Sequence, residues 1–344
     1  MDVLRYPLQS PPPTLTPSAV AIGFFDGVHL GHQAVLSRVQ ALGAEQDLPT
    51  TVVTFDAHPA QVLRPESAPR LLVNLEQKLE LLASTGVERT LVITFDEDRA
   101  SESPEHFVDS VLIGAVGAQL VVVGEDFHFG HRRAGNVSML REMGQLHGFE
   151  VVGLSLVGRD GSAARPELQV SSTAIRRALA ERRLSEANAM LGRPHEMRGP
   201  VVLGDQRGRT IGFPTANVAV GTEMLLPADG IYAGHLGLSD GSWMPAAIYV
   251  GKRPTFYKDA EMSLLEVHCI GFSGDLYGQQ VAVRFEHHLR ADARFGSVEE
   301  LAQQLADDVV LAERLLCVSD VAEDGSTFVE YAANMTRYRS EGSR

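Results

Sequence analysis

Cysteine, long apolar runs and positive charge are all scarce in this sequence of 344 residues. Its two cysteines, Cys269 and Cys317, form no CxxC pair, which argues against a disulfide framework or a cysteine zinc site and fits a reducing compartment. No apolar run approaches the roughly 18 residues of a membrane-spanning helix. With 30 basic against 44 acidic residues the net charge is −14, which disfavours a nucleic-acid surface. These absences predict a cytoplasmic protein whose partners are neither membranes nor nucleic acids.

The N-terminus has a proline run at residues 11–13 in place of the basic segment and apolar core of a signal peptide, so no such peptide is expected. The length suggests two domains, and a hydrophobic content of 44% is ample for two packed cores. Near residues 184–200 the helical repeats end and Gly and Pro become frequent. We therefore predict one domain over residues 1–186 and a second over residues 187–344.

The most informative stretch is residues 19–32, AVAIGFFDGVHLGH. An apolar run ends at Gly23, an Asp-Gly turn follows, and His29 and His32 then fall in the first turn of a segment with helical spacing. A helix N-terminus offers free N–H groups and the positive end of the dipole, and residues three apart share one face, so both imidazoles suit a polyphosphate. The pattern predicts a nucleotide site that is not a P-loop. The alternative is a surface or metal-binding histidine pair, although no Cys or carboxylate follows at a ligand-like spacing.

The first half alternates short apolar strands with helices, which favours a parallel, doubly wound sheet. After the run that ends at Gly23, further strands are predicted at residues 50–55, 90–95, 120–124 and 150–157. Helices are predicted at residues 75–85, with Asn74 as N-cap, and at residues 104–113 and 137–147. Ligands bind beyond the carboxyl ends of such strands. The two histidines, Asp56 with His58, and Asp126 all fall at those ends.

Two more segments of this half can contact a ligand. Residues 124–136, ending at Asn136, form a Gly-punctuated basic loop that either folds over phosphates or an aromatic ring or is an ordinary exposed loop. Ser171, Ser172 and Thr173 open a helix with Arg176 one turn later. A plain N-cap explains one serine, whereas three hydroxyls and an arginine are a good donor set for phosphates.

The second half reads as an antiparallel barrel or sandwich. Its short strand-like runs lie at residues 198–203, 231–238, 244–250, 264–270 and 281–285. A helix at residues 185–191 precedes them and an amphipathic helix at residues 298–316 follows. Residues 319–344 are polar and weakly patterned, and we expect residues 338–344 to be a frayed tail.

Three features of this half suggest chemistry. Residues 204–209 form a glycine-bearing turn suited to phosphates. Thr215 and Asn217 supply the hard oxygen atoms that Mg²⁺ accepts, although Pro-Thr-Ala-Asn also reads simply as a turn. Glu266 lies within an apolar strand, where a carboxylate either faces solvent or is kept for function, such as accepting a proton from a hydroxyl during phosphoryl transfer.

Taken together these strings resemble the HxGH nucleotidyltransferases, in the version found in the bifunctional bacterial riboflavin kinase/FMN adenylyltransferase (FAD synthetase) family. The resemblance covers roughly residues 15–316, because nine strings occur in the family's order: FDGVHLGH, TFDAHP, GEDFHFG, VSSTAIR, GRTIGFPTAN, LPADGIYAG, GKRPTF, LEVHCIGFSGDLYG and LRADARF. It implies an N-terminal Rossmann-like adenylyltransferase domain and a C-terminal riboflavin kinase domain built on a β-barrel.

The resemblance also implies the two reactions and their residues. The kinase half would phosphorylate riboflavin from ATP, with Glu266 as general base and with Thr215 and Asn217 holding Mg²⁺. The N-terminal half would join FMN to the α-phosphorus of ATP and release pyrophosphate, with His29 and His32 stabilising charge on the phosphates. The residues assigned to ATP and its phosphates are Gly23, Phe24, Asp26, Gly27, Gly31, Ser171, Ser172, Thr173, Arg176, Gly208 and Arg209. Those assigned to flavins are Asp56, His58, Asp126, Asn136, Arg290 and Arg294.

The chain departs from the family pattern at three places. Phe24 stands where Asn is common, residues 247–251 lack the usual Asn-Ile-Gly, and Gly271 replaces a frequent acidic residue. An enzyme with one working half, a flavin sensor without turnover, and a nucleotidyltransferase for a pantetheine or nicotinamide precursor remain as alternatives. The sequence leaves open whether the chain forms a homo-oligomer.

Overall fold

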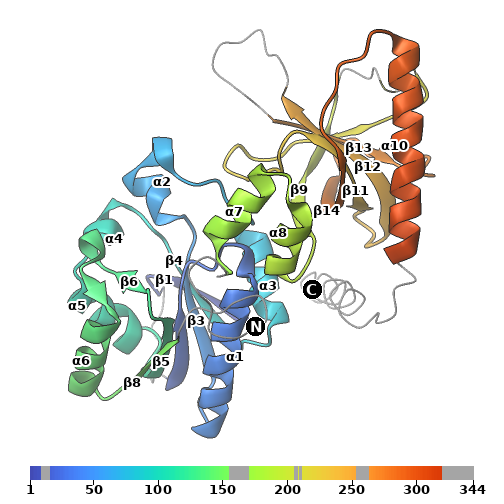
Figure 1. Cartoon of the computed structure of the whole chain (residues 1–344). Coiled ribbons are helices and arrows are strands. Elements are labelled where there is room, and N and C mark those ends of the chain that lie inside the picture. Colours follow the sequence, from blue (N-terminus) through green and yellow to red (C-terminus); the bar gives the residue numbers. More distant parts are fainter. Residues whose placement is uncertain (9–15, 155–169, 205–207, 209–210, 253–262, 320–344) are drawn as a thin grey trace. The chain divides into compact units, whose positions relative to one another are not determined.

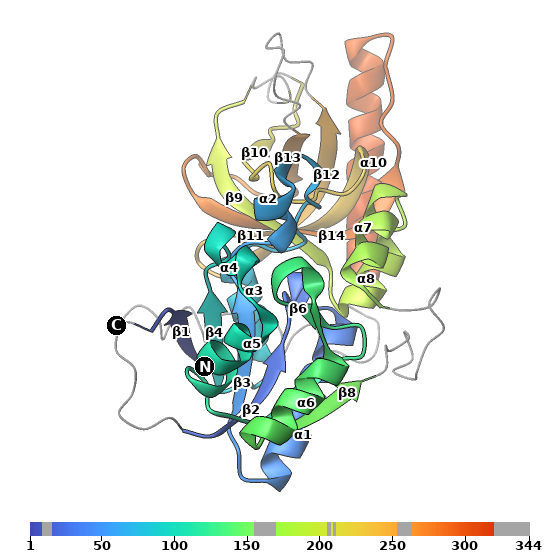
Figure 2. The same cartoon turned by 90° about the vertical axis from the view of Figure 1, so that its left-hand side faces the viewer.

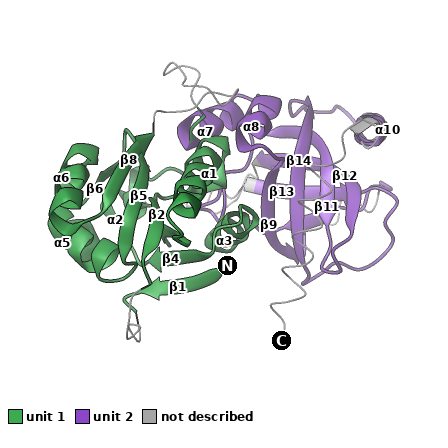
Figure 3. Ribbon diagram, turned by 90° about the horizontal axis from the view of Figure 1, so that it is seen from below, with its two compact units in different colours: residues 1–69, 74–171 green, residues 70–73, 172–344 purple. Residues whose placement is uncertain are grey.

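The computed structural model describes residues 1–8, 16–154, 170–204, 208, 211–252 and 263–319 (Figure 1). It divides into two compact units, coloured separately in Figure 3. Unit 1 consists of residues 1–69 and 74–171, and unit 2 of residues 70–73 and 172–344. Residues 155–157 of a predicted strand and the polar segment 320–344 lie outside the described residues.

Unit 1 is built on a six-stranded sheet in the order β1-β4-β3-β2-β5-β8, with every neighbouring pair parallel (Figure 2). Its strands are β1 (Asp2–Tyr6), β2 (Ser18–Ile22), β3 (Thr50–Phe55), β4 (Arg89–Ile93), β5 (Ala118–Gly124) and β8 (Glu150–Leu154). The predicted doubly wound parallel sheet is confirmed, with one strand more than the sequence indicated. The missed strand β1 lies at the sheet edge and is mostly exposed, so no buried apolar run marked it.

The strand order places the switch point of the sheet at β2. From β2 the chain goes to β3 and β4 on one side, whereas β5 and β8 lie on the other. Helices that leave neighbouring strands in opposite directions at such a point leave a crevice at the carboxyl ends of the strands. The segment with the two histidines therefore begins where this fold binds ligands.

Short helices connect the strands of unit 1, and a small hairpin follows β5. The bounds are α1 (Leu30–Glu45), α2 (Pro59–Leu63), α3 (Leu75–Ser84), α4 (Glu97–Ser101), α5 (Pro104–Phe107), α6 (Val137–His147), the 3₁₀ turns η1 (Asp26–Val28), η2 (Pro65–Ser67) and η4 (His131–Arg133), the π-helical turn η3 (Val108–Ile113), and the hairpin strands β6 (His128–Phe129) and β7 (Gly135–Asn136). The helix predicted at residues 104–113 is thus split between α5 and η3. Apolar residues of α5, η3 and α6 pack on the sheet to form the core.

Unit 2 is a closed antiparallel barrel in the order β10-β13-β12-β11-β14-β9. Its elements are α7 (Ser172–Ala180), α8 (Leu184–Leu191), β9 (His195–Val202), β10 (Ala216–Val218), β11 (Gly230–Gly237), β12 (Trp243–Lys252), β13 (Ser263–Cys269), β14 (Gln280–Arg290) and α10 (Val298–Ser319). The predicted barrel and its C-terminal helix are confirmed, and Ala312 and Leu316 of α10 pack against Ala233 and Ile270. None of the helices in the described residues has the length and apolar character needed to cross a bilayer.

One barrel strand was read from the sequence as a turn. β10 has only three residues, too few for an alternating pattern to stand out, yet it pairs with both β13 and β9 and closes the barrel. Asn217 lies at its centre.

Candidate active sites

The loop between β2 and α1 has an unusual backbone. Phe25 (φ 55°), Gly27 (φ 81°) and Val28 (φ 39°) all lie in the left-handed region, which is unfavourable for Phe and even more so for the β-branched Val. Such residues cost about 1–3 kcal/mol each and persist only where the surrounding structure holds them in place. Phe25, Asp26 and Val28 are also buried, so the loop is a fixed part of unit 1.

This loop delivers His29 and His32 to the start of α1 as a stacked pair. Their ring centroids are 3.6 Å apart with an interplanar angle of 16°, and the Phe25 ring meets His32 edge-on at 5.1 Å. His29 is the N-cap and not part of the first turn, because its Nδ1 accepts the His32 N–H at 3.3 Å. The predicted shared face is therefore present, at the positive end of the α1 dipole.

Glycine is required next to the histidines. A Cβ on Gly31 would lie 2.9 Å from the Val170 carbonyl oxygen and 3.2 Å from the His29 ring, and one on Gly23 would lie 3.1 Å from the Phe25 ring. The Gly31 contact brings the chain that leads into Ser171 against the first turn of α1. This much of the hydroxyl-rich segment is thus close to the histidines within unit 1.

The rest of that segment belongs to unit 2. Ser172 and Thr173 open α7, as predicted, and Arg176 lies one turn later. The Arg176 Nε donates to the carbonyl oxygen of Arg70 at 2.8 Å, which ties residues 70–73 to unit 2.

The residues after β3 have structural partners of their own. Asp56 Oδ1 accepts the Phe95 N–H at 3.0 Å. His58 caps α2, its Nδ1 accepting the Ala60 N–H at 3.0 Å, and its ring meets Phe24 edge-on at 4.8 Å. Phe24, which stands where Asn is common in the family, therefore packs on His58, a residue assigned to the flavin.

Sequence reasoning missed Lys78, which lies at the same strand ends. Its Nζ donates to the carbonyl oxygens of Phe24 at 3.1 Å and of Phe55 at 2.7 Å. Burial lowers the pKa of Lys78 to about 8, although the nearby charges of Asp26 and Asp56 act to raise it. The sequence could have identified Lys78, because this residue interrupts the apolar stripe of the helix predicted over residues 75–85.

The loop after β5 is folded as the β6–β7 hairpin. Asp126 is exposed, and its carbonyl oxygen accepts the Nδ1–H of His128 at 2.8 Å. Asn136 caps α6, with Oδ1 accepting the Met139 N–H at 3.0 Å. The Glu102 carbonyl oxygen accepts the His131 N–H at 2.7 Å, which joins the loop to the α4–α5 corner.

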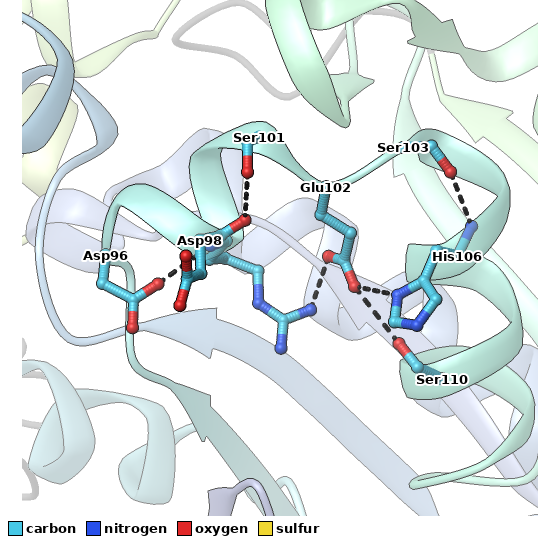
Figure 4. A network of polar contacts seen from close by, with 8 residues as sticks. Asp96, Asp98, Ser101, Glu102, Ser103, His106 and Ser110 are labelled. Atoms are coloured by element: carbon cyan, nitrogen blue, oxygen red, sulfur yellow. Dashed lines mark hydrogen bonds and ion pairs between the residues drawn. The ribbon is translucent and has the colours of Figure 1, made fainter.

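The α4–α5 corner is itself organised by the carboxylate of Glu102 (Figure 4). It accepts from Arg99 at 2.5 Å and from Ser110 at 3.4 Å, and the His106 Nδ1 lies 2.6 Å away. The network thus fixes the side chain of Glu102, the residue whose backbone carbonyl oxygen accepts the His131 N–H.

In unit 2, three polar residues stand abreast on three neighbouring strands. Asn217 of β10 and Tyr249 of β12 each lie directly opposite Glu266 of β13, so the three share one face of the sheet. Leu265 and Val267, on either side of Glu266, are buried on the other face. Glu266 is half-buried.

Two glycines approach the side chains at the β10 end of this row. Asn217 is 7% exposed, and its Oδ1 has no hydrogen-bond partner among the described residues. A Cβ on Gly204 would overlap the Asn217 amide, and one on Gly208 would lie 3.6 Å from Thr215 Oγ1. Gly204 and Gly208 therefore lie close to Asn217 and Thr215, the two residues assigned to the metal. Arg209 lies outside the described residues.

Tyr249 is a second residue that sequence reasoning missed as a site candidate. It occupies the segment that lacks the family's Asn-Ile-Gly, and its hydroxyl donates to Asp292 at 3.4 Å. Burial, together with the charge of Asp292, raises its pKa to about 12, so it is a hydrogen-bond donor at neutral pH.

The two arginines assigned to flavins differ in their surroundings. Arg290 ends β14 and binds Asp308 of α10 through Nε at 2.9 Å and Nη2 at 2.7 Å. Arg294 is exposed in the loop that follows. The guanidinium of Arg290 thus already holds α10 on the barrel.

Comparison with known proteins matches both units. A model of the FAD synthetase family matches residues 12–173, and a model of the riboflavin kinase family matches residues 191–316. The bifunctional riboflavin kinase/FMN adenylyltransferase of Haemophilus influenzae is 37% identical over 295 residues, which are 86% of this chain and 93% of that protein. That of Escherichia coli K12 is 36% identical over 294 residues, 85% and 91% of the two chains.

A solved structure also resembles the chain over nearly its whole length. It is described as a macrolide-efflux protein from Streptococcus pneumoniae, and it is 30% identical with a TM-score of 0.80. The match covers 91% of this chain and 99% of that one.

Proposed function

The chain belongs to the bifunctional riboflavin kinase/FMN adenylyltransferase family, and we propose how its two units divide that chemistry. It is an enzyme that phosphorylates riboflavin to FMN and adenylylates FMN to FAD, using ATP in both steps. We assign FMN adenylylation to a domain over residues 1–186 and riboflavin phosphorylation to residues 187–344. The observation that carries this proposal is the presence of one site of each kind. One is a stacked histidine pair at a helix N-terminus, and the other is a barrel carboxylate opposite a buried amide whose oxygen has no hydrogen-bond partner among the described residues.

In the N-terminal site the attacking group is the phosphate of FMN, which is already ionised, so no general base is needed. His29 and His32 stabilise the charge that builds up on the ATP phosphates as the pyrophosphate leaves. The positive end of the α1 dipole adds to that field. Ser171, Ser172, Thr173 and Arg176 hold the leaving pyrophosphate, while Gly23, Phe24, Asp26, Gly27 and Gly31 form the nucleotide loop.

We assign the flavin of this reaction to Asp56, His58, Asp126 and Asn136. His58 and Asn136 each cap a helix through one side-chain atom, which fixes the orientation of the side chain. Fixed orientation is the property that a positioning residue needs.

In the kinase site Glu266 takes the proton from the 5′-hydroxyl of riboflavin as that oxygen attacks the γ-phosphorus of ATP. Gly208 and Arg209 line the phosphate loop. Arg290 and Arg294 are assigned to the flavin side; because Arg290 is paired with Asp308, we expect it to shape the site from the end of β14.

Magnesium is part of this proposal. Asn217 Oδ1, Thr215 Oγ1 and the ATP phosphates are hard oxygen donors of the kind that Mg²⁺ accepts. A buried amide oxygen that has no partner in the described part of the chain fits that role. When bound, Mg²⁺ neutralises phosphate charge. We further propose that the enzyme works in the cytoplasm, with small molecules as its partners and no nucleic acid; whether it assembles as a homo-oligomer is left to solution measurements.

The test is a time course with purified protein, riboflavin, ATP and Mg²⁺, with the flavins separated by chromatography. FMN should rise first and then give way to FAD. FMN alone would contradict the adenylyltransferase assignment and direct attention to Phe24. FAD formed from supplied FMN, with none from riboflavin, would contradict the kinase assignment. Conversion of neither flavin would refute both.

A further inference from the structure

Lys78 is the most deeply buried charged side chain near the carboxyl ends of the parallel strands. It lies in the first half of α3 and is 2% exposed, although lysines are almost never fully buried without partners. An uncharged residue would have filled this part of the core at less cost. The contacts of the ammonium group must therefore offset the cost of burying its charge.

Its contacts join two neighbouring strands at the point where ligands bind. Phe55 is the last residue of β3, and Phe24 follows β2 by two residues. The Nζ atom donates to both carbonyl oxygens and lies 4.0 Å from the centroid of the Phe24 ring. The Phe24 carbonyl oxygen also accepts from Thr54 Oγ1 at 3.1 Å. One peptide group is thus fixed by two buried donors.

That peptide group begins the left-handed loop. Phe25, Gly27 and Val28 follow it, and the loop ends at His29. A backbone of this kind needs contacts that outweigh its cost. Lys78 and Thr54 supply such contacts at the start of the loop, as the Nδ1 cap of His29 does at its end.

We propose that Lys78 is a positioning residue for adenylyl transfer: by holding the Phe24 and Phe55 carbonyl groups it fixes the loop that sets His29 and His32 at the phosphates. Thr54 shares this task through the same carbonyl oxygen. Asp26 of η1 and Asp56 after β3 lie near the ammonium group. The positive charge of Lys78 offsets their negative charges and so makes the electrostatic potential of the loop less negative, which favours binding of a polyphosphate. The inference rests on the function proposed for unit 1.

Two variants separate hydrogen bonding from charge. Lys78→Met removes both, whereas Thr54→Val removes only the second donor to Phe24 and keeps the shape of the side chain. Gln40→Met is the matched control, because Gln40 donates to the Thr85 carbonyl oxygen at the opposite end of α3 at 2.9 Å. Riboflavin kinase activity of the same preparations reports on folding of the kinase domain, and circular dichroism compares the folding of the whole chain.

We expect Lys78→Met to lower kcat for FMN adenylylation by about 10- to 100-fold, the size of effect that a displacement of about 1 Å produces, with a smaller change in the KM for FMN. Thr54→Val should give a smaller loss of the same kind. Gln40→Met should match the wild type, and kinase activity should stay unchanged in all three. Adenylylation within twofold of the wild type in Lys78→Met, or an equal loss of both activities, would overturn the inference.

A second readout does not depend on the reaction. In protein labelled with ¹⁵N-histidine, the imidazole resonances of His29 and His32 should shift in Lys78→Met and Thr54→Val and not in Gln40→Met. Unchanged resonances would refute the positioning role even if unit 1 acts on another substrate. Shifted resonances in a protein that does not adenylylate FMN would instead refute the proposed function and leave the positioning role standing.

Discussion

In both units a charged residue on an otherwise apolar face of a strand or helix indicates a candidate site residue. Glu266 was found from the sequence because its strand neighbours are apolar, and the same reasoning applied to the helix at residues 75–85 would have found Lys78. Asn217 was also a candidate from the sequence, but only the pairing of β10 with β13 shows that it lies opposite Glu266. For a single residue, burial of a polar side chain indicates a functional position, and the groups that it contacts indicate its role.

The titration of Lys78 gives a prediction for stability. Its pKa falls from 10.5 in the unfolded chain to about 8 in the folded one, so folding disfavours the charged form. Below about pH 8 both states are protonated and the penalty is complete; between pH 8 and 10.5 the unfolded chain binds more protons, so stability rises with pH. The gain is on the order of 3 kcal/mol, at about 1.4 kcal/mol for each unit of pKa.

Urea unfolding at pH 7 and pH 10 measures this. The free energy of unfolding of the wild type, relative to Lys78→Met, should increase between the two pH values, and comparing the two proteins cancels the titration of all other groups. Equal changes in both proteins would show that Lys78 keeps an ordinary pKa in the folded state.

At the scale of elements, the start of α1 and the position of its histidines depend on how its first turn is packed. The His29 cap fixes where the helix begins, and Gly31 lets the chain before Ser171 lie directly against it. In unit 2 the corresponding element is β10, whose three residues close the barrel and place Asn217 beside Glu266. In both units the site geometry therefore depends on a few residues, at the first turn of α1 and in the three-residue strand β10.

Replacing Gly31 tests the packing of α1. Gly31→Ala adds a Cβ 2.9 Å from the Val170 carbonyl oxygen and 3.2 Å from the His29 ring, so one of them has to move. We expect adenylylation to fall at least about tenfold and stability to fall by about 1–3 kcal/mol, as for other overpacked sites. Steady-state kinetics and thermal unfolding measure the two effects. Ser37→Ala, at an exposed position of the same helix, is the control and should change neither; a Gly31→Ala protein with normal adenylylation would contradict the close approach.

At the scale of the whole molecule, two units of different architecture carry two different chemistries. One is a parallel sheet with a switch point and the other a closed antiparallel barrel, and each has its own polar constellation. FMN is the product of one reaction and the substrate of the other, so the two can be assayed separately on the same chain.

Two substitutions should therefore separate the activities. Glu266→Gln is expected to lower riboflavin phosphorylation about 10²- to 10⁴-fold, the usual value of a general base, while FMN adenylylation stays normal. His32→Asn should lower adenylylation about 10²- to 10³-fold with normal phosphorylation, as expected for loss of one electrostatic stabiliser. Assays with riboflavin and with FMN as separate substrates measure this. A loss of both activities in either variant would contradict the assignment of the two activities to the two domains, residues 1–186 and 187–344.

The sequence by itself determined the two architectures, the histidine pair and the carboxylate on the barrel, because each depends on local periodicity, capping or residue type that a linear pattern records. Strands β1 and β10 were not predicted, because an exposed edge strand and a three-residue strand have no row of buried apolar residues that a sequence pattern could show. Only the tertiary structure decided that Lys78 holds the loop before His29, that Asn217 and Tyr249 flank Glu266, and that Arg290 is paired with Asp308. Those contacts join residues between 17 and 54 positions apart, and some of them depend on strand register, so a linear pattern does not record them.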